Sequence, residues 1–143
     1  MFATSHVLAG AAIGAVDRDH PARAFALGVA SHVAMDLAPH WGRPLAANEF
    51  LRIARRDGLL ALTALGAAVA VGRARPAILA GALGAVLLDI DKPSRHFLGR
   101  SCFPRSVDRF HDEIQNEAAH RLPLELAAGA ALAVLAAGLI RRV

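Results

Sequence analysis

Residues 122–140 read LPLELAAGAALAVLAAGLI, an apolar run in which Glu125 is the one charged residue. Alanine and leucine favour helices, and about 20 apolar residues are enough for a helix to cross a bilayer. The run is apolar on all sides, so a helix formed here has no polar face to turn toward water. The stretch therefore predicts a membrane-spanning helix.

Four shorter apolar segments precede this run, separated by polar residues, glycine or proline. They cover residues 3–16, 22–38, 58–71 and 77–90. Tyrosine is absent and aromatic residues make up 5% of the chain, so the residues that strands prefer are scarce. We expect an all-α fold in which residues 1–143 form one domain, a compact bundle of about five helices with a long polar loop at 94–121.

The shorter segments have about 14–17 residues, a length that buried helices of a soluble bundle share. Two features favour a membrane-embedded bundle over a soluble one. The third and fourth segments are also apolar all round, and glycine and alanine recur at the close spacing of packed membrane helices. If every segment crosses, the loops at 41–57 and 92–121 carry more basic residues than the opposite side, so the positive-inside rule places them in the cytoplasm.

The basic balance of the chain, a formal net charge of +4, does not indicate nucleic-acid binding. The arginines lie between apolar runs rather than along one helix face, and aromatic residues for base stacking are few. Cys102 is the one cysteine, so no disulfide framework is expected. The sequence predicts membrane lipids as partners and no nucleic acid, and it leaves the oligomeric state open.

Histidines and acidic residues gather on one side of this predicted topology. They are His6, His32, Asp36, His40, Asp89, Asp91, His111 and Glu113, whereas His20 falls on the other side. Ionisable groups at the ends of membrane helices are costly unless they are paired, so they are candidate functional residues. We expect His6, His32, Asp36, His40, Asp89 and Asp91 to be metal ligands and His111 and Glu113 to be catalytic.

His32 and Asp36 are four residues apart, so they share one face of a helix and both can reach one divalent ion. His40 continues this stripe if the helix persists past Pro39. The alternative is a capping histidine and an interfacial aspartate that contact only water. His6, in an otherwise apolar helix, is either a ligand or a hydrogen-bonded core residue.

Asp89 and Asp91 end an apolar helix, where the macrodipole opposes negative charge. They need a nearby cation, which is either a metal or an arginine such as Arg95 or Arg100. His111 and Glu113 are candidates for a general acid or base. The alternative is that they belong to a solvated helix that begins at Asp108.

These donors are nitrogen and oxygen without thiolate, which suits zinc first, and also manganese, iron or magnesium. Such an ion lowers the pKa of a bound water and lets it attack an ester or a phosphoester. The rival hypotheses are a non-catalytic membrane protein that binds a metal ion, and a structural or regulatory membrane protein.

From Leu88 to Arg100, the chain resembles the bacterial family of small inner-membrane proteins known as membrane-bound metal-dependent hydrolases. His6 fits the early-helix histidine of that family. Asp89 and Asp91 fit a Pro-Asp-Ile-Asp-His-Pro-like helix end, with leucine and lysine in place of its proline and histidine. His111 fits the start of a His-Arg-Gly-x-Thr-His-Ser-like motif whose second histidine is missing here. The resemblance implies a multi-pass protein of the bacterial inner membrane that hydrolyses its substrate with a metal ion.

The stretch from His32 to His40 also looks like a short motif of the helical zinc phospholipase C and nuclease superfamily. That similarity implies phosphoester chemistry, with a lipid as one candidate substrate.

Overall fold

The computed structural model describes residues 1–142, and these residues form helices without a β-strand. The long helices are α1 (Ala3–Val16), α2 (Pro21–Leu37), α3 (Ala47–Val71), α4 (Arg75–Val86) and α7 (Leu122–Ile140). Two short helices, α5 (Asp91–Leu98) and α6 (Arg105–Glu113), and two 3₁₀ turns, η1 (Leu88–Ile90) and η2 (Ala119–Arg121), complete the fold. The all-α prediction is confirmed.

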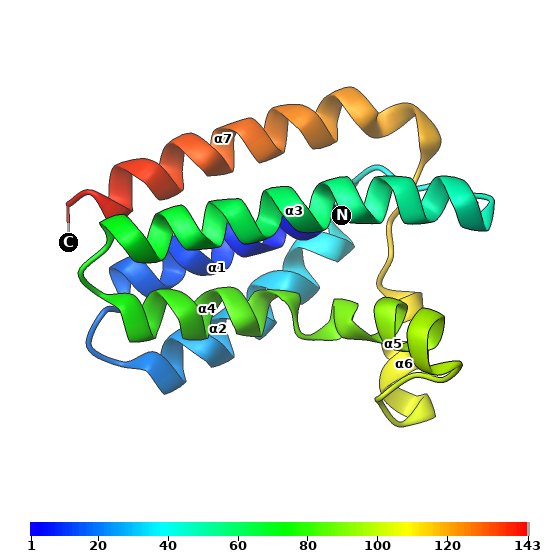
Figure 1. The fold of residues 1–143 in the computed structure, drawn as a ribbon, viewed down its shortest axis with the longest axis horizontal. Coiled ribbons are helices and arrows are strands. Elements are labelled where there is room, and N and C mark those ends of the chain that lie inside the picture. Colours follow the sequence, from blue (N-terminus) through cyan, green and yellow to red (C-terminus); the bar gives the residue numbers. More distant parts are fainter. Residues whose placement is uncertain (143) are drawn as a thin grey trace.

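Helix α1 is the centre of the bundle. It contacts α2, α3, α4 and α7, and the long helices run alongside one another around it (Figure 1). Most of its residues from Ser5 to Ala15 are buried, and six of these nine are alanine or glycine. A helix made of such small residues lets its neighbours approach closely on every side. The two short helices α5 and α6 pack at one end of the bundle (Figure 1).

The crossing of α1 and α4 depends on glycine. A Cβ atom at Gly10 would overlap the carbonyl of Gly81, and a Cβ at Gly81 would overlap the carbonyl of Gly10. A Cβ at Gly28 of α2 would also overlap the carbonyl of Gly81. The backbones of three helices therefore meet at positions where a side chain has no room.

Helix α2 buries one narrow stripe, which consists of Ala24, Gly28, His32 and Asp36. These residues are four apart, so they lie one above another on one helix face. Ala24 and Gly28 are small and pack tightly, whereas His32 and Asp36 are polar. The same stripe therefore fixes the helix against its neighbours and carries two candidate ligands into the interior.

The structure corrects three expected boundaries. Helix α3 begins at Ala47 rather than at residue 58, because the amphipathic stretch before residue 58 continues into the apolar segment without a break. Helix α4 ends at Val86 rather than at residue 90. The expected polar loop at 94–121 holds most of α5 and all of α6. Pro93 does not stop α5, because it lies in the first turn, where a missing N–H costs no helical hydrogen bond.

Among the described residues, one helix, Ala119–Ile140, is long and apolar enough to cross a membrane. The helices Ala3–Val16 and Arg75–Val86 are apolar but shorter. Helix length and composition therefore support one possible span, and they do not support the expected multi-pass arrangement.

The close crossing of α1 and α4 gives a first prediction. We expect Gly10→Ala to destabilise the fold by about 1–3 kcal/mol, because the new methyl group would push two backbones apart. Gly66→Ala is the matched control, since Gly66 lies in α3 with nothing within 4 Å of an added Cβ. Alanine is the better helix former by roughly 0.5–1 kcal/mol, so the control should match or exceed the wild type. Thermal unfolding of the purified proteins checks this, and equal midpoints for Gly10→Ala and Gly66→Ala would contradict it.

Candidate metal centre

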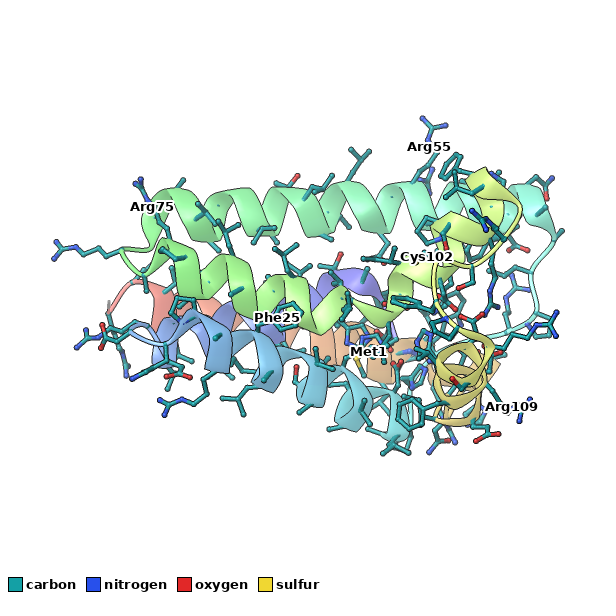
Figure 2. The ribbon with its side chains drawn as sticks, turned by 90° about the horizontal axis from the view of Figure 1, so that it is seen from below. Met1, Phe25, Arg55, Arg75, Cys102 and Arg109 are labelled. Carbon is teal, nitrogen blue, oxygen red and sulfur yellow. The ribbon has the colours of Figure 1, made fainter. Side chains whose placement is uncertain are left out.

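Five side chains from four elements converge at the end of the bundle where α5 and α6 pack. They are His6 of α1, His32 and Asp36 of α2, Asp89 of η1 and His111 of α6. We call these five residues the His/Asp cluster. Figure 2 marks this end of the molecule by Met1 and Arg109, and the opposite end by Arg75.

The His/Asp cluster lies in the interior. His6, His32 and Asp36 are fully buried, and His111 is 2% exposed. Taking a carboxylate out of water costs several kcal/mol unless it gains partners of opposite charge or hydrogen bonds. The buried carboxylates at this end therefore need hydrogen bonds or positive charges, which apolar side chains cannot supply.

Asp36 lies at the centre of the cluster. Its Oδ2 is 3.0 Å from Nε2 of His32 and 3.4 Å from Nε2 of His111. Its Oδ1 is 3.2 Å from Nε2 of His6. Asp89 lies across from it, with Oδ1 3.9 Å from Nε2 of His111 and Oδ2 4.0 Å from Nε2 of His6. All three histidines thus present Nε2 to Asp36, and His6 and His111 also present it to Asp89.

Two of the rings are fixed from behind by acceptors. Nδ1 of His32 is 2.7 Å from the carbonyl oxygen of Ala85, and Nδ1 of His111 is 3.4 Å from Oδ2 of Asp91. Because both partners accept hydrogen bonds, Nδ1 carries the proton and Nε2 of a neutral ring keeps a lone pair. Metal-binding histidines are commonly oriented in this way.

The two Nε2 atoms of His32 and His111 are only 3.1 Å apart. Two lone pairs at this distance repel, so a proton or a metal ion has to lie between them. Buried polar atoms without hydrogen-bond partners are a second indication that the cluster binds an ion. The two ring nitrogens of His6, together with Oδ2 of Asp89 and Oδ1 of Asp91, are buried without a hydrogen-bond partner among residues 1–142. Such atoms are rare in folded proteins and call for an explanation.

Cationic and amide groups surround the carboxylates. Lys92 donates to Oδ1 of Asp89 at 2.8 Å, and Gln115 donates to Oδ2 of Asp36 at 2.7 Å. The amino nitrogen of Met1 lies 3.3 Å from Oδ1 of Asp36. Burial alone would raise the pKa of Asp89, but the charges of Lys92, His6 and His32 together outweigh it and hold that pKa below its usual value.

Asp91 lies behind the cluster rather than in it. Its Oδ2 faces Nδ1 of His111 and also Arg95, whose guanidinium is 3.3 Å away. Burial alone would lower the pKa of His111, but the carboxylates of Asp36 and Asp91 outweigh it and raise the pKa to about 9. Asp91, which was predicted to be a ligand, is therefore placed to orient His111. It also pairs with Arg95, as the alternative of an arginine partner predicted.

His40 lies outside the cluster because α2 ends at Leu37 and Ala38 is extended, which breaks the stripe before Pro39. Its Nδ1 is 2.9 Å from the carbonyl oxygen of Ala38, and its Nε2 is 3.3 Å from Oε1 of Gln115. Gln115, which sequence reasoning missed, links His40 to Asp36. Its one sequence signal is its place four residues after His111.

The two predicted catalytic residues, His111 and Glu113, lie in different environments. His111 joins the cluster as a possible ligand, whereas Glu113 is exposed and has no ion pair or hydrogen bond from its side chain within residues 1–142. Two groups of donors in the cluster lie close enough together to hold a metal ion. They are His6 with His32 and Asp36, and His32 with Asp89 and His111.

A cavity of about 610 Å³ lies beside the cluster, and Asp89, Lys92 and Glu117 form part of its wall. Much of the remaining wall is apolar. It includes Phe2, Trp41, Leu45, Phe50, Leu51, Ile53, Val86 and Phe97, with Arg43 and Arg55 among them. Asp57 also lines it, so the wall carries acidic as well as basic groups. The cavity can therefore hold an apolar molecule that has a polar or charged end.

The chain matches no protein-family model, and no curated protein or solved structure is significantly similar to it.

The raised pKa of His111 predicts how the stability of the metal-free protein depends on pH. A histidine whose pKa rises on folding stabilises the fold fully below its unfolded value near 6.5 and loses that contribution as the pH passes about 9. After chelation, the unfolding midpoint of the wild type should fall between pH 6.5 and 9. Asp91→Asn should flatten this fall, because it removes one of the charges that raise the pKa. A wild-type midpoint that rises over this range would contradict the assignment.

Proposed function

We propose that the protein is a metal-dependent hydrolase that acts at the face of a membrane. The convergence of three buried Nε2 atoms on Asp36, two of which also face Asp89, is the observation that carries the proposal. Zinc ligands at 2.0–2.2 Å in a tetrahedral site lie about 3.4 Å from one another. The separations of 3.0, 3.1 and 3.4 Å among donors of His32, His111 and Asp36 are close to this value.

The donor set favours zinc, with manganese, iron or magnesium as alternatives, since it consists of imidazole and carboxylate without thiolate. A bound ion supplies a water of lowered pKa for attack on an ester or a phosphoester. Asp91 and the carbonyl of Ala85 hold the rings of His111 and His32 in the tautomer that binds metal. Lys92, which contacts Asp89 at the cavity wall, is placed to stabilise negative charge on a substrate.

The apolar cavity beside Asp89 supports a substrate with a hydrocarbon portion. Arg43 pairs with Glu49, whereas Arg55 has no ion pair among the described residues and supports a negative charge on that substrate. A lipid phosphoester or ester has both features. The resemblance to membrane-bound metal-dependent hydrolases, which rests on His6, Asp89 and His111, agrees with this chemistry.

Exposed apolar side chains support the membrane location. On α7, Leu126 is 58% exposed and Val134 is 77% exposed, and on α3, Leu62 is 68% exposed. A soluble monomer rarely leaves contiguous patches of this kind in water. We infer that α7 and the outer face of α3 contact lipid of a bacterial inner membrane, with the His/Asp cluster on the cytoplasmic side.

The complete burial of His6, His32 and Asp36 favours a second candidate, a membrane protein that binds a metal ion without catalysing a reaction. Catalysis needs an open position on the ion and access for a substrate, whereas binding needs only the ligands. Assays of metal content and of hydrolysis on the same preparation separate the two functions.

Metal content is the first test of the function. We expect the detergent-purified wild type to bind zinc or manganese, and His32→Ala and Asp36→Asn to lose most of it. The first removes an imidazole donor, and the second removes the negative charge and one oxygen donor of the central carboxylate. Asp91→Asn should weaken affinity by about 10–100-fold, since it disturbs only the orientation of His111. His20→Ala is the control, because His20 pairs with Asp17 and lies outside the cluster. Elemental analysis, with circular dichroism to check folding, measures these effects.

Hydrolysis of phosphoester and ester substrates presented in mixed micelles should follow metal content across the same variants. A wild type that binds no metal after loading with zinc or manganese would refute the metal centre. A wild type that binds metal but hydrolyses none of these substrates would favour the non-catalytic alternative.

Fractionation of expressing cells tests the location. Because α7 and α3 expose so many apolar side chains, we expect the protein to sediment with membranes, to remain there after an alkaline carbonate wash, and to be released by detergent. Release into the soluble fraction without detergent would show instead that these faces pack against protein.

A further inference from the structure

We propose that the His/Asp cluster holds two divalent ions, bridged by the carboxylates of Asp36 and Asp89. The inference rests on the proposed metal centre and specifies how it is built. One ion would lie on the side of His6, and the other on the side of His32 and His111.

The stacking of two rings is the first argument. The rings of His6 and His32 lie with centroids 4.1 Å apart and planes inclined by 20°. The lone pair of an imidazole nitrogen lies in the ring plane, so a bound ion lies in or near that plane. Two stacked, nearly parallel planes have no common point close to both Nε2 atoms. The donor atoms of His6, His32 and Asp36 lie close enough together for one ion. The direction of the lone pairs, however, does not allow that ion to lie in the ring planes of both histidines.

The carboxylate distances sort the donors into the same two groups. Asp36 directs Oδ1 to His6 at 3.2 Å and Oδ2 to His32 at 3.0 Å. Asp89 directs Oδ2 to His6 at 4.0 Å and Oδ1 to His111 at 3.9 Å. Each carboxylate thus has one oxygen on each side. This is the arrangement of a carboxylate that bridges two ions.

The buried atoms without partners supply an independent argument. Nε2 of His6 and Oδ2 of Asp89 lack hydrogen-bond partners within residues 1–142, and both belong to the His6 side. An ion bound only by His32 and His111 would leave these two atoms unsatisfied. A second ion on the His6 side would satisfy both of them.

The two sides differ in the number of protein donors. His32, His111 and one oxygen from each aspartate give four donors, which fill a tetrahedral site. His6 and the other two oxygens give three, which leaves a position open for water or substrate. Lys92 does not exclude an ion from Asp89, because a carboxylate oxygen can accept from Lys92 and bind a metal with its other lone pair.

Two ions about 3.5–4 Å apart stabilise the attacking and the leaving oxygens of a displacement at phosphorus. The arrangement therefore favours a phosphoester over a carboxylic ester as substrate. Asp89 lies on the cavity wall, so the phosphorus-bearing end of an amphiphilic substrate would approach the cluster from the cavity.

The number of ions is measured on the wild type, loaded with manganese and freed of excess metal. We expect two manganese ions per chain and an exchange-coupled electron paramagnetic resonance spectrum. His6→Asn should keep one ion and give the uncoupled six-line spectrum, because the His32 side is left intact. His20→Ala, the matched control, should keep two ions.

Saturation of the folded wild type at one ion per chain, with an uncoupled spectrum, would overturn the inference. Hydrolysis by such a one-ion protein would leave the proposed function standing. Two coupled ions without hydrolysis would uphold the inference and refute the hydrolase, whereas a protein that binds no metal would overturn both. A preference for p-nitrophenyl acetate over bis(p-nitrophenyl) phosphate would overturn the substrate class.

Discussion

The carboxylate of Asp36 lies in an interior without room for bulk water, and histidines from α1, α2 and α6 close around it. A buried charge persists only where partners replace its hydration. Those partners come from three helices, so the charge constrains how the helices pack as well as what the centre binds. The remaining polar contacts support it: Gln115 contacts Asp36 directly, and Asp91 and the carbonyl of Ala85 hold two of the three rings.

Small residues make this convergence possible. On α1, His6 lies one turn before Gly10, and on α2, His32 lies one turn after Gly28. Both glycines contact α4 at Gly81, where backbones meet without side chains between them. Because each histidine shares a helix face with the glycine beside it, the tight packing that glycine allows also determines how closely the imidazole rings approach. The stacking of His6 on His32 is a consequence of this spacing.

The composition was sufficient to predict an all-α fold, and the four-residue spacing of His32 and Asp36 was sufficient to predict that they share one helix face. The grouping of His6 and Asp89 with them followed from the order of the helices along the chain. Other features depended on tertiary structure. The approach of His111 requires α6, whose polar sequence resembles a loop, and the displacement of His40 follows from the end of α2 before Pro39. Sequence alone could not show that Asp89 and its neighbour Asp91 have different partners, because the turn at η1 determines where each side chain points.

Helix α4 ends one residue after Ala85, and the last carbonyls of a helix have no amide partner within it. One of these carbonyls accepts the Nδ1 proton of His32. The choice of tautomer at the centre is therefore coupled to the length of a neighbouring helix. A change of sequence near residues 86–88 that prolonged α4 by one turn would give this carbonyl a helical N–H as a second donor and weaken its hydrogen bond to the imidazole. Evolution could thus tune the affinity of the proposed metal centre through a helix terminus while every candidate ligand stays the same.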